Sequence, residues 1–322
     1  MKKNQILIPL IYLLLGSLLF GCDSAIPSLS NPFVNIPQGK IVFESWRDHV
    51  DEDYGDEFTI SHGSEVYVMD TNGDNQVRLT FTQFGGSRQP IWTPDGNFII
   101  YREDYQISGT DSDPFNQLMI MQVDGSNQQP LTKEIASKWW DISPYEKIYG
   151  DSWTLAVHCN VGLYQAKNFQ CLWISDNDIF TFDVSQNQSA SDGINLTNTP
   201  AAFELDPIWS PDGSAIAFSS NKESGIDFCR NISTPESGGG YDIFIMNPDG
   251  SNAINLTVTK EVMETNPSWS PDKEWLVFTS QKCIGAKSEL TPQIYIMKRD
   301  GSNLQKLTDT VGSNASPAWQ PT

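Results

Sequence analysis

Short apolar runs separated by glycine, proline, aspartate and asparagine dominate the chain from Lys40 onward. The clearest example is residues 207–220, where Pro-Ile-Trp is followed by Ser-Pro-Asp-Gly and then by a second apolar run. Pro-Asp-Gly favours a tight turn because proline presets φ and glycine accepts a positive φ. The pattern therefore predicts a β-hairpin with a tryptophan at its entrance. Related segments lie at 90–101, 267–278 and 317–321, with a degenerate copy at 140–157.

A second kind of hairpin follows the first. Its leading strand precedes a glycine turn and its closing strand ends in a Leu-Thr pair; copies begin at residues 65, 118, 242 and 293, and a weaker one covers 178–182. One such unit cannot bury its own apolar face, so repeated copies imply units that pack on one another. In four copies the threonine follows the glycine by seven positions: Gly73 and Thr80, Gly125 and Thr132, Gly250 and Thr257, Gly301 and Thr308.

Each unit thus carries four short strands, which we name A, B, C and D in chain order. No long stretch beyond the N-terminal region shows helical periodicity, so we expect an all-β fold. Four-stranded antiparallel units arranged radially form a β-propeller. The first unit lacks strand A, and the segment around Trp319 lacks B to D, so we expect that segment to pair with 40–44 and close the ring. The anchor tryptophans favour five blades, with a sixth inside 138–197 as the alternative: Trp92, Trp140, Trp209, Trp269 and Trp319.

The Trp-Ser-Pro-Asp-Gly and Asp-Gly-Ser-Asn motifs resemble those of the TolB-type, WD-repeat-like propeller family. The resemblance extends from about Lys40 to the C-terminus and implies one propeller over residues 39–322. It does not select a function, because the family includes protein-docking modules, ligand sensors and non-catalytic domains of peptidases.

Residues 1–22 have the pattern of an export signal. Lys2 and Lys3 precede an apolar run over 6–20 that is too short and wrongly flanked for an ordinary membrane-spanning helix. Leu-Phe-Gly-Cys at 19–22 resembles a bacterial lipobox, which implies lipidation of Cys22; a simple cleaved signal or an uncleaved anchor is the alternative. Residues 23–38 predict a flexible tether. We therefore expect an exported protein, lipid-anchored to a bacterial membrane and facing the periplasm or the cell exterior.

The chain carries 20 basic and 40 acidic residues, for a net charge of −20. This charge argues against nucleic acid and against an anionic membrane surface as partners. It suits a cationic ligand or a basic protein surface, or it only keeps the protein soluble. We expect a monomer without cofactor that binds an envelope protein or a polar ligand and touches the membrane through its lipid anchor only.

The B–C connections are predicted to be long and dissimilar, at roughly 45–64, 103–116, 159–177, 221–241 and 281–292, whereas the A–B and C–D turns are short. Loops on a rigid frame commonly carry recognition, so the insertion face is the predicted binding surface, with neutral variation as the alternative. Acidic residues in 44–62 suggest a solvated loop, and a cation site there is the alternative. The candidate ligand-binding residues of this first insertion are Trp46, Arg47, His49 and Tyr54.

A second candidate site is a polar ring at one mouth of the central channel. A polar residue lies three positions before each anchor tryptophan, and equivalent register would bring these side chains together. Glu204 and Glu264, two positions earlier, would add negative charge there. Such a ring suits a small polar ligand or a peptide of a partner, with ordered water as the alternative. The predicted ring residues are Gln89, Ser137, Asp206, Asn266 and Ser316.

Four cysteines follow Cys22, and an even number in an exported protein suggests disulfides. We predict Cys159–Cys171 within one insertion and Cys229–Cys283 between two neighbouring insertions, while the other pairings stay open. A zinc site is the alternative, but no metal-ligand spacing supports one.

No catalytic motif is recognisable. The chain has only three histidines, at 49, 62 and 158, and lacks both the Gly-x-Ser-x-Gly elbow and the His-Glu-x-x-His zinc motif. We therefore predict a non-catalytic, membrane-tethered binding module. A carbohydrate or small-ligand sensor that uses the channel mouth is the alternative, and a glycosidase-like enzyme with paired carboxylates is a weaker one.

Overall fold

The computed structural model describes residues 36–48, 63–82, 85–93, 95–105, 115–131, 135–136, 158–159, 170–175, 178–183, 193–199, 202–223, 240–259, 262–283 and 291–321. Every regular element in these ranges is a β-strand, which confirms the all-β prediction. Among them, no helix has the length and apolar character needed to cross a membrane. The predicted signal segment 1–22 and nearly all of the predicted tether 23–38 lie outside these ranges.

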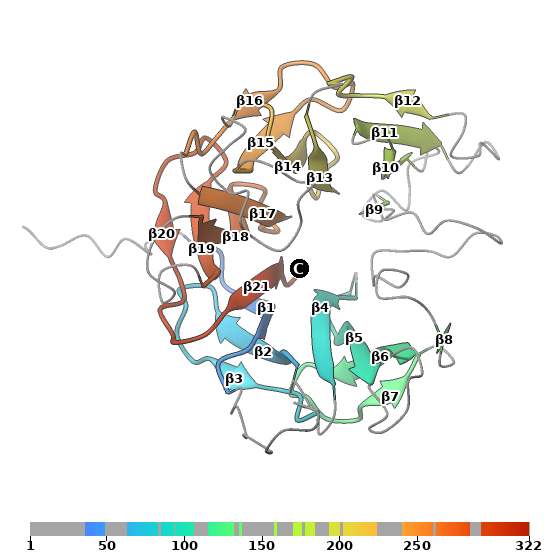
Figure 1. Cartoon of the computed structure of the whole chain (residues 1–322), viewed down its shortest axis with the longest axis vertical. Helices are drawn as coiled ribbons and strands as arrows, with labels where there is room; N and C mark the ends of the chain where they lie inside the picture. The colour runs from blue at the N-terminus through green and yellow to red at the C-terminus, as the bar shows by residue number, and fades with distance from the viewer. Residues whose placement is uncertain are drawn as a thin grey trace, which may run out of the picture. The chain divides into compact units, whose positions relative to one another are not determined.

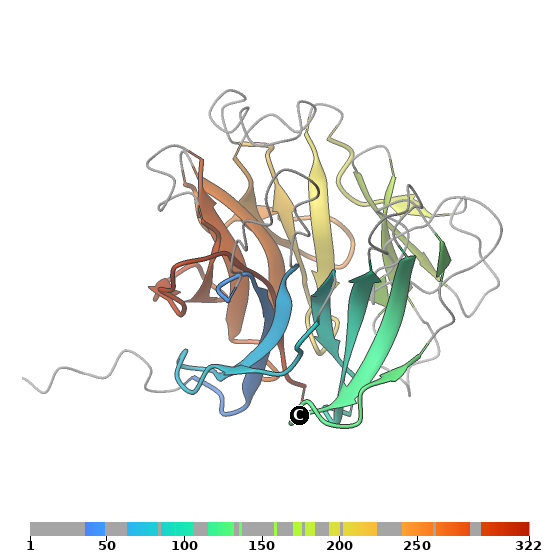
Figure 2. The ribbon, with the colours of Figure 1, turned by 60° about the horizontal axis from the view of Figure 1, so that its bottom comes forward.

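The strands form five antiparallel sheets, which we number as blades 1 to 5. Figure 1 shows them arranged around a common centre, and in the side view of Figure 2 the strands of successive blades stand roughly parallel. The first strand given for each blade is strand A, except in blade 3, which is treated below. Blade 1 contains β21 (Asn314–Trp319), β1 (Lys40–Ser45), β2 (Glu65–Asp70) and β3 (Val77–Arg78). Blade 2 contains β4 (Gly86–Trp92), β5 (Phe98–Tyr105), β6 (Phe115–Gln122) and β7 (Gln129–Pro130), and β8 (Ile135–Ala136) also pairs with β6.

Blade 4 contains β13 (Glu204–Trp209), β14 (Ile216–Ser220), β15 (Asp242–Met246) and β16 (Ile254–Asn255). Blade 5 contains β17 (Val262–Trp269), β18 (Trp275–Lys282), β19 (Gln293–Lys298) and β20 (Gln305–Lys306).

Blade 1 combines the two ends of the propeller chain, as predicted. Strand β21 pairs antiparallel with β1, with Trp319 opposite Ile41. Without β21, the edge of β1 that faces the centre of the ring would be unpaired, and an unpaired sheet edge invites association with other chains. The closing strand is also fixed to blade 5, because the Trp319 amide donates to Ser268 Oγ at 3.0 Å.

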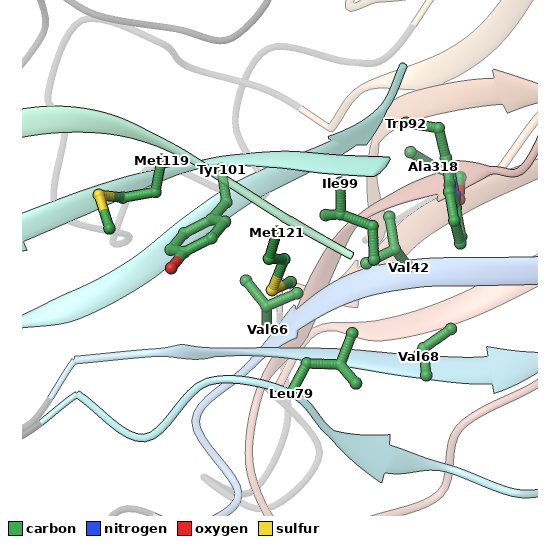
Figure 3. Close-up of a cluster of buried hydrophobic side chains, with 10 residues drawn as sticks. All are labelled: Val42, Val66, Val68, Leu79, Trp92, Ile99, Tyr101, Met119, Met121 and Ala318. Carbon is green, nitrogen blue, oxygen red and sulfur yellow. The ribbon is translucent and has the colours of Figure 1, made fainter. Parts of the chain in front are cut away.

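The core lies between neighbouring blades. Figure 3 shows one cluster, in which residues of blade 1 such as Val42 and Val66 pack against Ile99 and Met121 of blade 2. Trp92 takes part and also donates its indole N–H to the carbonyl of Ala318, at 3.0 Å. Trp269 donates in the same way to Ile208 of the preceding blade, at 3.4 Å. Trp92 and Trp269 therefore join neighbouring blades through their indole N–H groups.

In blades 1, 2, 4 and 5, the glycine of the C–D hairpin allows close approach to the preceding blade. Gly301 has φ +80°, and a Cβ there would lie 2.7 Å from the carbonyl oxygen of Leu256, the leucine of the previous Leu-Thr pair. Gly125 has the same relation to Leu79. A side chain would force the blades apart, so this contact gives a physical reason for the glycine in the repeat.

Blade 3 differs from the predicted arrangement. Its order is β12 (Ile194–Asn195), β11 (Asp178–Asp183), β10 (Gln170–Ser175) and β9 (His158–Cys159), so β10 is strand B and β9 occupies the strand A position. The prediction of strand B at 153–157 and of a B–C insertion over 159–177 was wrong. Strand β10 fills the supposed insertion, and its Trp173 pairs with Phe180 as Phe43 pairs with Tyr67 in blade 1. Residues 137–157, including Ser137 and Trp140, lie outside the described residues.

Candidate functional site

In four blades, strand A is the inner strand, nearest the centre of the ring (Figure 1), and it has a β-bulge at the predicted ring position. The strand register shifts between Arg88 and Ile91, between Leu205 and Ile208, and between Thr265 and Ser268, and β1 shows the matching shift against β21. Each bulge holds a non-glycine residue at positive φ, which is costly for an L-residue, and each is followed by proline. These residues are Gln89 (φ 49°), Asp206 (φ 52°), Asn266 (φ 54°) and Ser316 (φ 51°).

Side chains of adjacent blades accept the amide hydrogens that the bulges release. The Gln89 amide donates to Glu44 Oε2 at 3.0 Å, and the Ser316 hydroxyl donates to Glu44 Oε1 at 3.0 Å. The Asn266 amide donates to Asp206 Oδ2 at 3.0 Å. The structure therefore links the predicted ring residues in two groups, one around Glu44 and one around Asp206. Sequence reasoning missed Glu44, although it directly follows an aromatic strand residue that recurs in each blade.

Burial changes the acidity of both acceptor groups. It raises the pKa of Glu44, and the bonds from Gln89 and Ser316, together with the charges of Arg88 and Arg102, lower it in part. Burial also raises the pKa of Asp206, against the hydrogen bond from Asn266. The inner strands thus hold carboxyl groups whose charge is disfavoured, which suits a site able to exchange protons or accept a cation.

Glu204 and Glu264 do not supply exposed charge, contrary to the sequence-based expectation. They are only 1% and 2% exposed. Glu204 accepts hydrogen bonds from the hydroxyls of Thr199, at 2.8 Å, and Ser220, at 3.0 Å. Burial raises the pKa of Glu264 to about 7, with the nearby charge of Asp242 acting in the same direction.

These two glutamates belong to a polar connection between blades that the sequence did not predict, which we call the threonine clasp. In blade 4 it consists of Asp242, Thr257 and Thr259, joined to Glu264 of blade 5. The Ile243 amide donates to Thr257 Oγ1 at 3.0 Å, and Thr259 Oγ1 donates to Asp242 Oδ1 at 2.9 Å. The corresponding residues of blades 1, 3 and 5 are Glu65, Thr80 and Thr82; Asp178, Thr197 and Thr199; and Gln293, Thr308 and Thr310.

Two arginines stand opposite each other beside the bulge of blade 2. Arg88 and Arg102 are cross-strand partners in β4 and β5. Arg102 Nε donates to Asp104 Oδ1 at 2.8 Å, and its Nη1 donates to Gln89 Oε1 at 3.2 Å. Arg88 Nε lies 3.1 Å from Asp104 Oδ2, and the Arg88 guanidinium lies 5.7 Å from the ring centre of Trp46. Trp46, predicted as an insertion residue, thus lies beside the Gln89 bulge.

Arg47 has a structural environment. Its guanidinium lies 4.6 Å from the centre of the Tyr67 ring and donates to Gln76 Oε1, at 2.5 Å, and to Asn314 Oδ1, at 2.7 Å. These bonds connect the end of β1 with β21 and with the turn after β2, so the side chain serves packing within blade 1. The other two predicted residues of this insertion, His49 and Tyr54, lie outside the described residues.

The cysteines are partly placed. Cys283 is disulfide-bonded. Cys159 and Cys171 are directly opposite in β9 and β10, and opposite residues of an antiparallel pair have Cα atoms about 4.5–5.5 Å apart, within the range of a disulfide. The Cys159–Cys171 and Cys229–Cys283 pairings stay predictions, and Cys22 and Cys229 lie outside the described residues. In the part of the chain that the structure describes, no three potential metal ligands gather.

No family model matches the chain. Dipeptidyl-peptidase 5 of Porphyromonas endodontalis is 32% identical over 91 residues, which are 28% of this chain and only 12% of that much longer protein. TolB from Agrobacterium tumefaciens is 15% identical, with 87% of this chain and 92% of that chain covered and a TM-score of 0.45. TolB from Acinetobacter baumannii is 14% identical, with 88% and 67% covered and a TM-score of 0.39.

An oligogalacturonate lyase in complex with manganese is 16% identical, with 76% of this chain and 59% of that chain covered and a TM-score of 0.30. The similar structures thus include TolB proteins, whose repeat motifs this sequence resembles, as well as an enzyme. The propeller assignment rests on the five sheets of this chain itself.

Proposed function

We propose that the protein is a non-catalytic, exported binding module, tethered to a membrane through Cys22, that holds an envelope protein or a polar ligand at its B–C face. The observation that carries this proposal is the contrast between the two ends of the blades. Short turns at 93–97, 210–215 and 270–274 connect strands A and B, whereas the B–C connections run over 46–64, 106–114, 221–241 and 283–292. Uniform turns serve the frame, and long dissimilar connections serve recognition.

The inner strands give a second argument that the binding face lies at this end of the molecule. Gln89, Asp206, Asn266 and Ser316 keep a strained backbone, and strain of this kind is common at binding sites. The ligand would contact the insertions and the polar groups of the inner strands together. A small ligand held mainly by the inner strands is the second candidate, favoured by Asp206, which keeps partial exposure although burial raises the pKa of its carboxyl group.

Binding can be tested with the full chain as bait against a detergent-solubilised envelope fraction and a glycan array. Replacing 225–238 or 107–113 by a short Gly-Ser linker should reduce retention of the bound partner at least tenfold. Lys273→Gly is the matched control, because Lys273 lies in an A–B turn with φ +61°, where glycine fits. Retention that is unchanged in both loop variants would reject the insertion face as the binding surface. Turnover of a glycoside would show that the protein is an enzyme and not a binding module.

The tether has its own test. Cys22→Ala should abolish incorporation of labelled fatty acid and move the protein from the membrane to the soluble fraction. Cys283→Ala, which changes a cysteine outside the predicted lipobox, should remain membrane-bound. Membrane association that persists in Cys22→Ala without any label would instead indicate an uncleaved anchor.

A further inference from the structure

The bulge of blade 5 is capped in a different way from the bulges of blades 1 and 2. The Ser316 amide of blade 1 donates to Thr279 Oγ1 of blade 5 at 3.1 Å. The Gln89 amide of blade 2 donates to Glu44 Oε2 of blade 1 at 3.0 Å. Thr279 and Glu44 both lie in strand B of the preceding blade, each opposite the residue just before that blade's own bulge. At these two boundaries, strand B therefore supplies the acceptor.

Ser219 holds this strand B position in blade 4, but its hydroxyl is not used. It lies opposite Leu205, just before the bulge at Asp206. The Asn266 amide of blade 5 donates to Asp206 Oδ2 of strand A instead, at 3.0 Å. Ser219 is 0% exposed, and its Oγ has no hydrogen-bond partner, which is a cost for a buried hydroxyl. The fold thus keeps a second acceptor at the position that serves the corresponding amide elsewhere.

Asp206 is not otherwise committed to holding the blades together. Among the described residues, the bond from the Asn266 amide is its one hydrogen bond, and Oδ1 accepts none. Asp206 also keeps partial exposure, so a ligand can reach its carboxyl group. Because Ser219 can supply an acceptor for Asn266, Asp206 can turn to a ligand without leaving that amide unpaired.

The surroundings of Asp206 favour a positively charged ligand. Burial raises the pKa of Asp206, and burial together with the charges of Asp206 and Glu204 raises the pKa of Tyr241 to about 12. In the part of the chain that the structure describes, no lysine or arginine contributes to either shift, whereas two arginines lower the pKa of Glu44. A cation bound at Asp206 would supply the opposite charge that this boundary lacks.

We propose that Asp206 binds a primary ammonium group, and that the Ser219 hydroxyl then accepts the amide hydrogen of Asn266. An ammonium carries one positive charge and three hydrogen-bond donors, which suits a carboxylate with a free oxygen. A metal ion fits less well, because it takes several oxygen ligands and no three potential metal ligands gather among the described residues. This site rests on the second candidate function, a ligand held by the inner strands, and specifies the chemistry of that ligand.

Butylammonium is a direct probe, with butan-1-ol as its uncharged counterpart. Calorimetry or ligand-observed NMR on the full chain should detect butylammonium, with butan-1-ol weaker by about tenfold or more. Asp206→Asn should weaken butylammonium binding by a similar factor, because it removes the charge but keeps an oxygen for the Asn266 amide. Asp212→Asn is the matched control, because it removes the same charge from an A–B turn, where Asp212 pairs with Lys273 at 2.5 Å.

Ser219→Ala tests the transfer of the amide. It should leave the stability of the free protein unchanged or raise it, because the lost hydroxyl has no partner there. It should nevertheless weaken butylammonium binding by about threefold or more, because the Asn266 amide would lose its acceptor in the bound state. Thr279→Val is the contrast: it should lower the stability of the free protein, because the Ser316 amide uses that hydroxyl. Circular dichroism of each variant checks that it is folded.

The ammonium could belong to a free amine or to a lysine of a bound envelope protein. Acetylating the amines of the envelope fraction should reduce retention on the full chain if a lysine is bound, and should leave retention unchanged if a free amine is bound. Equal binding of butylammonium and butan-1-ol, equal effects of Asp206→Asn and Asp212→Asn, or no butylammonium binding to the wild-type protein would each overturn the site. Unchanged butylammonium binding in Ser219→Ala would overturn the transfer of the amide.

The loop replacements keep this site distinct from the insertion face. If they still reduce retention of the envelope ligand while butylammonium does not bind, the insertion face stands and the ammonium site is rejected. If butylammonium binding depends on Asp206 while the loop replacements have no effect, the ammonium site stands and the insertion face is rejected.

Discussion

At the scale of single residues, several polar side chains have roles other than those their sequence positions suggest. Arg47 and Glu264 were expected to meet a ligand or to charge the channel mouth, yet both contact the protein itself. Arg88 was not singled out at all, yet it lacks partners for its terminal nitrogens among the described residues. A charged side chain whose hydrogen-bonding groups are satisfied by the protein has a structural role, whereas one that lacks acceptors can bind a ligand. Only the structure gives the number of acceptors around each group.

Glu264 should make stability fall as pH rises. Its pKa in the folded protein is about 7, above the ordinary value near 4.5, so the folded state holds the proton more tightly than the unfolded chain. The contribution of protonated Glu264 to the free energy of unfolding is complete below about pH 4.5 and is lost as pH rises through about 7. Its upper limit is about 3 kcal/mol. Glu264→Gln should remove this slope when urea unfolding is compared at pH 5 and pH 8. Glu274→Gln, at an exposed turn, should keep it.

Arg47→Met should lower stability without affecting the ligand. The substitution keeps much of the apolar stem but loses the bonds to Gln76 and Asn314, at an expected cost of about 1–3 kcal/mol in chemical denaturation. Retention of the envelope ligand should match the wild-type protein under conditions where both are folded. A selective loss of ligand with unchanged stability would show that Arg47 contacts the ligand after all.

At the scale of elements, one arrangement explains why the repeat keeps its motifs. The Leu-Thr pair ends strand D, its threonine satisfies the amide that follows the first residue of strand C, and its leucine meets the hairpin glycine of the next blade. The same few residues therefore close one blade and position the next. Strand A completes the connection with the bulge, where a side chain of a neighbouring blade caps the freed amide.

Thr257→Val should test the threonine clasp. It keeps the shape of the side chain but leaves the buried Ile243 amide without its acceptor, which should cost about 1–3 kcal/mol in the free energy of unfolding. Val258→Thr, at the adjacent position that is 72% exposed, should change stability by less than about 0.5 kcal/mol. Equal effects of the two substitutions would mean that the clasp is not a source of stability.

At the scale of the whole molecule, the fold depends on joining residues near both ends of the propeller chain. Trp319→Ala should cost about 3–5 kcal/mol, because Trp319 is buried and sits in the strand that covers β1. Val311→Ala, at a position that is 96% exposed, is the control. Denaturant unfolding and light scattering would measure both effects, and a similar stability for the two variants would contradict the closing role of β21.

The sequence predicted the repeated part of this architecture and missed the irregular part. The Pro-Asp-Gly and Asp-Gly turns carry their own backbone geometry, so their hairpins and the β21–β1 closure followed from short motifs. Blade 3 lacks those turns, and nothing local marks β10 as strand B. Likewise, the repeat register alone located Gln89 and Asp206. The pairing of Arg88 with Arg102 depends on how two strands align, so it could not be predicted before the strand pairing was known. The Thr-x-Thr spacing at 80–82, 197–199, 257–259 and 308–310 was a visible signal for the clasp.

The contribution of β21 to blade 1 also sets an order of events when the chain is made. Blades 4 and 5 have all four strands as soon as residue 306 has emerged, whereas blade 1 waits for Asn314–Trp319 although its other strands were synthesised first. Until then, β1 offers a bare backbone edge to any neighbouring polypeptide. A nascent or translocating chain would therefore benefit from a chaperone that shields its earliest segment and releases it only after the latest one arrives.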